Sequence, residues 1–178
     1  MEEKKYWDEF KRIAKDREIE AGWSKVEKDS VAQKDGVYVF KCIGDNHDIW
    51  EAHELKKGES LHYFFIGDHQ HSDGWWPIVV PTDYLVIPSF REGIPEWKRP
   101  IRQPKIGESM RFFNNGGFVI IALKINGKIK YYDQMNCPYM DYKARFINGA
   151  VFFDPIWDIH VPEDMQEDFT LLGFYTIG

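Results

Sequence analysis

Apolar residues recur at helical spacings in the first segment of the chain, with charged residues between them. The apolar positions of this segment are Tyr6, Trp7, Phe10, Ile13 and Ala14. The spacing predicts one amphipathic helix over residues 3–19, because side chains three and four positions apart share a helix face. Gly22 then marks the end of helical structure.

From Val37 onward the pattern changes to short aromatic and β-branched runs separated by Gly, Asn, Asp and Pro. Runs of this kind are typical of strands, and no second helical period falls between them. The sequence therefore predicts a mainly β fold, an antiparallel β-sandwich or barrel of about ten short strands with one N-terminal amphipathic helix. A chain of 178 residues fits a single domain over 1–178, with a β-rich body at 37–178.

The Asn126-Gly127 pair gives the firmest local prediction, a two-residue hairpin turn with positive φ at both positions. Pairing across this turn sets Ile125 opposite Lys128, Leu123 opposite Lys130 and Ile121 opposite Tyr132. Apolar content rises away from the turn, so we expect an exposed tip and a buried base. A second Asn- and Gly-rich segment upstream extends the prediction to a three-stranded meander over residues 109–134.

Three prolines forbid a continuous helix or central strand over residues 94–105, which we expect to form an extended connector. Any seam between two lobes lies in this segment. Trp97, which we expect to be exposed, and its cationic neighbours form a mixture used by proteins that bind single-stranded nucleic acid, but a solvated linker that neutralises an acidic face is favoured. The cations are Lys98, Arg99, Arg102 and Lys105.

Residues 57–64 and 106–113 resemble each other, since both read Gly-Glu-Ser followed by aromatic residues. We favour ordinary turn-then-strand patterning over duplication of a half-domain.

Composition narrows the class of protein. Aromatic residues make up 16% and charged residues 29% of the chain, which excludes a disordered protein, a collagen-like repeat and a coiled coil. No apolar run approaches the roughly 18 residues that cross a bilayer, and the N-terminus is charged where a signal peptide is hydrophobic. Cys42 and Cys137 are too far apart for a Cys-x-x-Cys site, so reduced thiols and a cytoplasmic location are expected.

The distribution of charge predicts a partner. The formal net charge is −6, and residues 1–145 hold 23 basic and 23 acidic side chains. After Arg145 the chain contains no further Lys or Arg, so the charged side chains of this last stretch are carboxylates. They repel phosphate backbones and membrane surfaces. This argues against direct nucleic-acid or membrane binding and favours a basic protein partner, with Trp157 as an apolar anchor. The predicted partner-binding residues are Asp154, Trp157, Asp158, Glu163, Asp164, Glu167 and Asp168.

The same segment leaves two other interpretations open. One is a solvated loop without a partner. The other is a divalent cation held by Asp154, Asp158 and His160.

A histidine-rich segment predicts an alternative, metal-dependent site. Alternating residues of an extended chain point the same way, so a zinc or iron ion could bind there. The candidate ligands are His69, His71 and Asp73, completed by His62, Asp45 or Asp48. This pattern resembles, over five residues, the His-x-His-x-Asp of metallo-β-lactamase-type hydrolases, with Gly74 where that pattern commonly has another His. The alternative without a metal is a solvated turn between two strands.

A third hypothesis is a small-molecule site. Trp75 and Trp76 place one indole on each face of a strand, so one could stack on a nucleotide-like or sugar-like ligand while the other packs in the core. Arg99 or Arg102 could hold an anionic group.

The sequence lacks the nucleotide-binding glycine motifs, the serine-hydrolase elbow and the zinc-protease helix. We therefore favour a small cytoplasmic binding or inhibitor protein without catalysis, which uses its acidic C-terminal face. A metal-dependent hydrolase or metal-stabilised binder, with a divalent metal such as zinc, and a protein that sequesters a small molecule are the alternatives. The sequence does not decide the oligomeric state.

Overall fold

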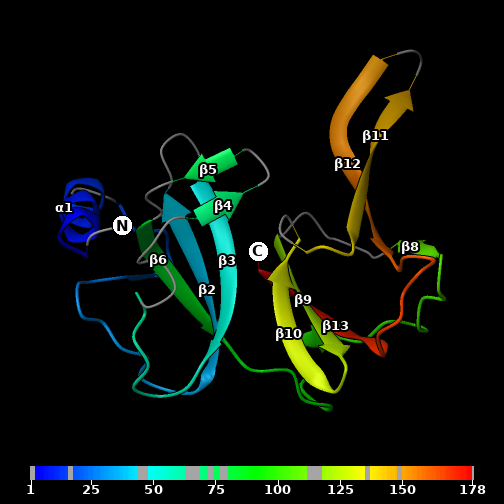
Figure 1. Ribbon diagram of the computed structural model, residues 1–178, viewed down its shortest axis with the longest axis horizontal. Coiled ribbons are helices and arrows are strands. Elements are labelled where there is room, and N and C mark those ends of the chain that lie inside the picture. Colours follow the sequence, from blue (N-terminus) through cyan, green and yellow to red (C-terminus); the bar gives the residue numbers. More distant parts are fainter. Residues whose placement is uncertain are drawn as a thin grey trace. The chain divides into compact units, whose positions relative to one another are not determined.

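In the computed structural model the chain divides into two compact units, Met1–Ser89 and Phe90–Gly178 (Figure 1). The structure describes residues 3–15, 18–43, 48–62, 69–71, 74–76, 80–111, 118–134, 137–147 and 150–177. Within strands it describes the backbone alone at 43, 48–49, 69–71, 74–76, 141–147 and 150–157. The single domain expected over residues 1–178 stays a prediction.

The predicted mainly β architecture is confirmed. The described residues form thirteen strands and one helix, and every strand pair among them is antiparallel. Each sheet order has two free ends within these residues, so none of the described sheets closes into a barrel.

Helix α1 spans Glu3–Ala14 and is shorter than the predicted helix over 3–19. Tyr6, Phe10 and Ala14 are buried along one face, as the apolar spacing indicated. The next positions on that face, 17 and 18, are charged, so the apolar stripe that holds the helix against the unit ends at Ala14. No helix in the described ranges is long and apolar enough to cross a membrane.

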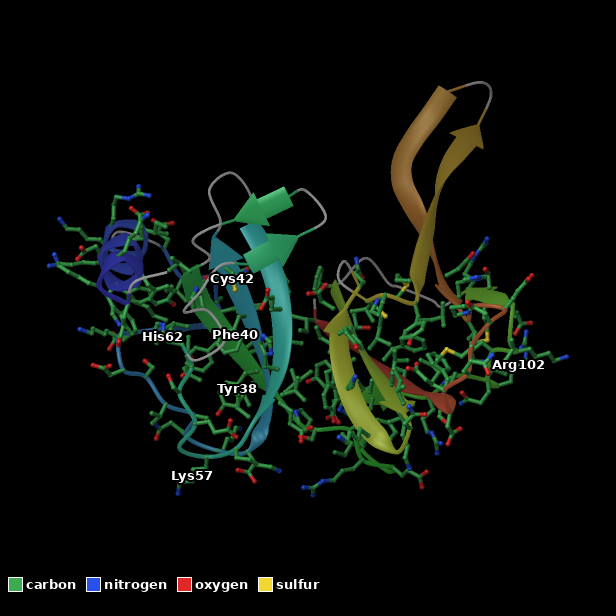
Figure 2. The ribbon with its side chains drawn as sticks, viewed as in Figure 1. Tyr38, Phe40, Cys42, Lys57, His62 and Arg102 are labelled. Carbon is green, nitrogen blue, oxygen red and sulfur yellow. The ribbon has the colours of Figure 1, made fainter. Side chains whose placement is uncertain are left out.

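The first unit contains a four-stranded sheet and a small hairpin. The sheet has the order β1-β6-β2-β3, with bounds Ser24–Lys25, Val80–Ile87, Gly36–Ile43 and Asp48–Leu55. The hairpin pairs β4 (His69–His71) with β5 (Gly74–Trp76). Tyr38, Phe40 and Cys42 alternate along β2 and bury their side chains in the core that α1 covers (Figure 2).

The second unit contains two sheets. The first has the order β10-β9-β13-β7, with bounds Lys128–Asp133, Phe118–Ile125, Phe169–Ile177 and Trp97–Lys98. The second has the order β11-β12-β8, with bounds Met140–Ile147, Ala150–His160 and Ser109–Arg111. Val119, Ile121 and Leu123 of β9 pack with Ile159 and Leu171 in the core of this unit.

The Asn126-Gly127 hairpin is confirmed in type and register. Asn126 has φ 51° and Gly127 has φ 81°, and the β9–β10 register contains all three predicted pairs. Residues 128–130 are exposed at the tip, whereas Tyr131 and Asp133 are buried at the base.

The predicted meander over 109–134 is wrong. Strand β8 pairs with β12, where Ser109 lies opposite His160, and does not pair with β9. The second edge of β9 is taken by β13, an apolar run near the C-terminus, so a contact between distant segments replaces the expected local one.

Trp97 is not the exposed ring that the sequence suggested. It is 3% exposed and lies in β7, opposite Tyr175 of β13. Its ring contacts Phe90, Tyr131 and Tyr175, with centroid separations of 5.3–5.8 Å. The connector is therefore tied to the sheet at this point, and Trp97 is a core residue of the second unit rather than a stacking platform.

The repeated Gly-Glu-Ser segments form the same turn in both units. The Glu59 carboxylate accepts a hydrogen bond from the Lys56 amide, and the Glu108 carboxylate accepts one from the Lys105 amide. The intervening glycines have φ 93° and 79°, a conformation that glycine adopts without strain. These contacts are local, so the turn-then-strand interpretation suffices to explain them.

Candidate functional site

Residues 161–168 form a loop, here called the acidic loop, that joins β12 to β13 in the second unit. At its start, Val161 exchanges backbone hydrogen bonds with Gly107 and Glu108 at 2.8 and 3.1 Å. At its end, the backbone N–H of Asn126 donates to the Asp168 carbonyl, and the backbone N–H of Asp168 donates to the side-chain oxygen Oδ1 of Asn126. Both distances are 2.9 Å. Both ends are thereby fixed to neighbouring turns, which limits the conformations open to the side chains between them.

Four carboxylates of the acidic loop project into solvent. They are Glu163, Asp164, Glu167 and Asp168, all of them exposed. No Lys, Arg or His in the described part of the chain makes an ion pair with any of the four. The hydroxyl of Tyr139 donates to Glu167 Oε2 at 3.5 Å, and burial together with the Glu167 charge raises the pKa of Tyr139. The loop thus presents unneutralised negative charge on an anchored backbone.

An exposed isoleucine, which sequence reasoning missed, adjoins the acidic loop. Ile106 is 66% exposed, and its neighbour Gly107 approaches the Glu163 side chain so closely that an added Cβ would lie 3.0 Å from Cγ. Ile101, in the same connector, is fully exposed. An exposed apolar side chain near charged groups is one of the features from which a contact surface can be built. The signal available in the sequence was an isoleucine within a polar, proline-rich segment, where no core strand uses it.

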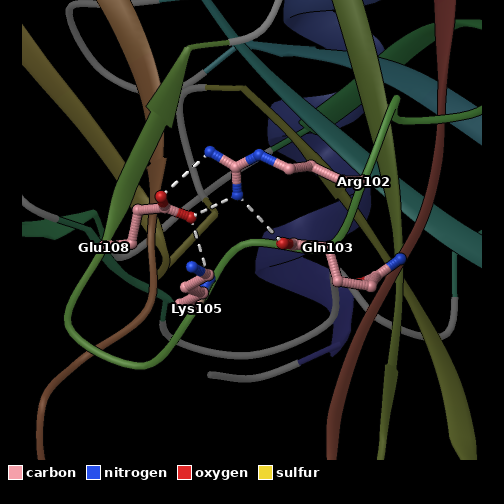
Figure 3. A network of polar contacts seen from close by, with 4 residues as sticks. All are labelled: Arg102, Gln103, Lys105 and Glu108. Atoms are coloured by element: carbon pink, nitrogen blue, oxygen red, sulfur yellow. Dashed lines mark hydrogen bonds and ion pairs between the residues drawn. The ribbon is translucent and has the colours of Figure 1, made fainter.

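The connector that carries Ile106 is braced by a polar network (Figure 3). Arg102 binds the Glu108 carboxylate through both terminal nitrogens, at 2.7 and 2.9 Å, and also donates to the Gln103 carbonyl at 3.2 Å. The hydrogen bond from Arg102, with one from the Lys105 amide, lowers the pKa of Glu108 to about 2. Glu108 is therefore neutralised locally and does not add to the charge of the acidic loop.

Gln103 fastens the same connector to β13. Its side-chain amide donates to the Leu171 carbonyl and accepts from the Leu171 amide, both at 2.8 Å. These contacts lie beside the point where the β9–β13 register shifts, between Leu171 and Gly173, and they pair both backbone polar groups of Leu171 with one side chain.

The other predicted partner-binding residues lie on β12. Asp158 is only 9% exposed, faces Arg111 across the β8–β12 pair, and has Oδ1 3.5 Å from Arg111 Nε. Asp158 is therefore a buried side chain of the sheet and is not one of the exposed carboxylates of the acidic loop. His160 Nδ1 lies 2.8 Å from the Ser109 hydroxyl. Asp154 and Trp157 are strand residues of β12 whose side chains lie outside the description, so the Trp157 anchor is untested.

The division into two units distributes the formal charge differently from the division of the sequence at Arg145. The first unit holds 12 basic and 18 acidic side chains, whereas the second holds 11 of each. Residues 90–145 are rich in cations and fold into the same unit as the acidic C-terminal stretch. The negative surface is therefore a local property of the acidic loop rather than a net charge of its unit, and its field extends only about 8–10 Å at physiological salt.

The predicted metal site stays a prediction. His69 and His71 lie in β4, paired in register with Trp76 and Gly74 of β5, but their side chains and all of Asp73 lie outside the described residues. Asp45 also lies outside them. Among the side chains that the structure does describe, no group of three or more His, Cys, Asp or Glu could hold a metal ion.

His62, proposed as a further metal ligand, has another role. Its ring is buried in the first unit, where Nδ1 lies 3.0 Å from the Tyr6 hydroxyl and Nε2 lies 2.8 Å from the Glu27 carbonyl. Both ring nitrogens are therefore occupied by protein groups in the core.

The small-molecule hypothesis gains little from the described residues. Trp75 and Trp76 form most of β5, but their side chains lie outside the description. Arg99 lies 3.3 Å from Glu92, and Arg102 is held by Glu108, so each guanidinium already has a carboxylate partner. Neither arginine is available to an anionic ligand without exchanging that partner.

Comparison with known proteins found no match to the chain among protein-family models, curated proteins or solved structures.

Proposed function

We propose that this protein is a non-catalytic binding protein whose acidic loop engages a basic protein partner. The observation that carries the proposal is the set of four exposed carboxylates, Glu163, Asp164, Glu167 and Asp168, which lack an ion-pair partner among the described residues and sit on an anchored loop. Like charges held together repel one another, and a cationic surface that covers them removes this cost.

The chemistry around the loop defines the partner further. Ile106 is exposed, and its chain neighbour Gly107 lies against Glu163, so the partner should present an apolar side chain flanked by lysine or arginine. A protein that covers such a cationic surface also competes with other anions for it, which supports an inhibitory role. Both cysteines are buried thiols rather than a disulfide, which supports a reducing compartment, and we place the protein in the cytoplasm as part of the proposal.

The test is binding of the full chain to a short synthetic peptide that alternates lysine with leucine, measured by fluorescence anisotropy. The acidic-loop variant carries Glu163→Gln, Asp164→Asn, Glu167→Gln and Asp168→Asn. We expect it to bind at least about tenfold more weakly, because each amide keeps the size of the side chain but loses its charge. Ile106→Ser should weaken binding without changing its salt dependence.

A matched control separates a site from general charge. Asp8, Glu18, Glu54 and Glu96 are exposed carboxylates without an ion pair among the described residues, and amide substitutions there change the net charge equally. The control variant should bind the peptide within about twofold of the unmodified chain. Equal weakening by both variants, or no weakening by either, rejects the acidic loop as the binding surface.

A further inference from the structure

A groove runs between α1 and residues 25–28 in the first unit. It has a volume of about 240 Å³, and its floor is formed by Phe10, Ala14 and Val26, all of them buried. Residues 25–28 are held in place by the backbone, because the Val26 amide donates to the Thr82 carbonyl at 2.9 Å and the Glu27 carbonyl accepts from His62. The groove therefore has an apolar floor, and the segment of residues 25–28 that forms one of its sides is fixed to the rest of the unit.

Lysines line both banks of this groove. Lys11 and Lys15 belong to the helix bank, Lys25 and Lys28 belong to the opposite bank, and all four are exposed. The ammonium of Lys28 also lies 5.4 Å from the centroid of the Trp7 ring, so this lysine reaches across to α1. Glu27 is the single carboxylate among the lining residues.

The four ammonium groups are not neutralised within the described part of the chain, where none makes an ion pair. Arg12 provides the contrast, because its guanidinium is engaged by Glu9 three positions earlier on α1. The unit as a whole carries 12 basic and 18 acidic side chains. A cluster of unpaired cations is thus a local feature opposed to the overall charge, and an anionic occupant stabilises it.

We propose that this groove binds an acidic amphipathic segment of another protein, with apolar side chains on the floor and carboxylates directed to both banks. A single-headed anion such as a fatty acid can satisfy one bank or one end, whereas cations on both sides of an apolar floor fit carboxylates that flank an apolar stripe. The site lies in the other unit from the acidic loop and has the opposite charge, so it is independent of the function proposed above.

The probe is a fluorescein-labelled synthetic peptide with leucines at helical spacing and glutamates on both flanks, followed by anisotropy with the full chain. The groove variant is Lys11→Gln, Lys15→Gln, Lys25→Gln and Lys28→Gln. The control variant replaces Lys4, Lys34, Lys56 and Lys57, which are exposed, lie outside the groove lining and have no ion pair among the described residues. We expect at least about tenfold weaker binding by the groove variant and a change within about twofold for the control.

Two further arms keep the result decisive. Should the fourfold variant lose its fold, the pairs Lys11→Gln with Lys15→Gln and Lys25→Gln with Lys28→Gln should each give a partial loss, because the banks act together. A peptide with serine in place of leucine should bind at least about tenfold more weakly, and decanoate should not displace the original peptide.

Several outcomes overturn the proposal. If the groove and control variants lose the same affinity for the peptide, or if the serine peptide binds as tightly as the leucine peptide, binding is an unspecific attraction between charges. Displacement by decanoate with the same lysine dependence makes the groove a site for a single-headed anion. The acidic-loop variant should bind the acidic peptide as the unmodified chain does, so failure of one surface is distinguishable from failure of the other.

Discussion

The hydroxyl oxygen of Tyr6 lies 3.0 Å from Nδ1 of His62, and both side chains are buried. Because the Glu27 carbonyl can only accept, Nε2 of His62 carries the ring proton and Nδ1 accepts from the tyrosine. Trp7 and Phe10 surround the same ring, with centroids 4.6 and 4.9 Å away. Among the described residues, this hydrogen bond joins helix α1 to the rest of the unit within an aromatic cluster.

Replacing Tyr6 with Phe should destabilise the first unit by about 1–3 kcal/mol, because the buried Nδ1 of His62 loses its donor while the ring packing is kept. Urea unfolding followed by tryptophan fluorescence measures the change. Tyr84→Phe is the matched control, since the Tyr84 ring stacks on Tyr38 and is only half-buried. A loss for Tyr6→Phe no larger than for Tyr84→Phe would contradict the assigned hydrogen bond.

Stability should fall as the pH drops below about 6.5. Burial lowers the pKa of His62 beneath its usual value of 6.5, against weaker opposing effects from the Glu27 carbonyl and Asp29. The unfolded chain therefore binds this proton first, so the stabilisation is present above pH 6.5 and is lost as the pH falls through the folded pKa. Unfolding of the unmodified chain between about pH 7.5 and pH 5 should depend on pH more steeply than that of His62→Gln. Identical slopes would reject the assignment.

Both thiols should be unreactive in the folded protein. Cys42 is 0% and Cys137 is 6% exposed, and burial raises the pKa of Cys137 to about 12. At about pH 8 a thiol-specific disulfide reagent should modify neither cysteine before unfolding and both in guanidinium chloride. Rapid modification of the native chain would show that one core opens more readily than its packing indicates.

Gln103→Ala should destabilise the second unit by about 1–3 kcal/mol, because the Leu171 amide and carbonyl lose their partners at the irregular point of β13. Gln166→Ala is the control: Gln166 is exposed, donates to the Asp164 carbonyl, and should cost less than about 0.5 kcal/mol. Equal changes, measured by urea unfolding, would mean that Gln103 does not fasten the connector.

Features set by neighbouring residues could be predicted from the sequence. The Asn126-Gly127 turn fixes its own register through the backbone angles of two residues, and the apolar stripe of α1 identifies its buried face. The meander was mispredicted because β13, which lies far along the chain, competes for the same edge of β9. Pairing between distant segments has no signature in a local pattern.

In the candidate site, too, local features could be predicted from the sequence, whereas features that depend on contacts between distant segments could not. The run of carboxylates in the acidic loop is visible as composition, but Ile106 comes near it through contacts between distant segments, the Val161 hydrogen bonds and the approach of Gly107 to Glu163. The cations and prolines around Trp97 predict an exposed ring, whereas pairing with Tyr175 buries it. The sequence groups Asp158 with the exposed carboxylates, but the β8–β12 register sets it beside Arg111, where it is buried.

Zero-length carbodiimide coupling shows which carboxylates of the chain meet a basic partner, because it joins an amine only to a carboxylate that it touches. The full chain is mixed with the lysine–leucine peptide, coupled, digested and mapped by mass spectrometry. We predict that the peptide amines are joined to Glu163, Asp164, Glu167 or Asp168 and that coupling falls as salt rises from about 50 to about 200 mM. Coupling mainly to carboxylates of the first unit, such as Asp8, Glu18 or Glu54, would contradict the account.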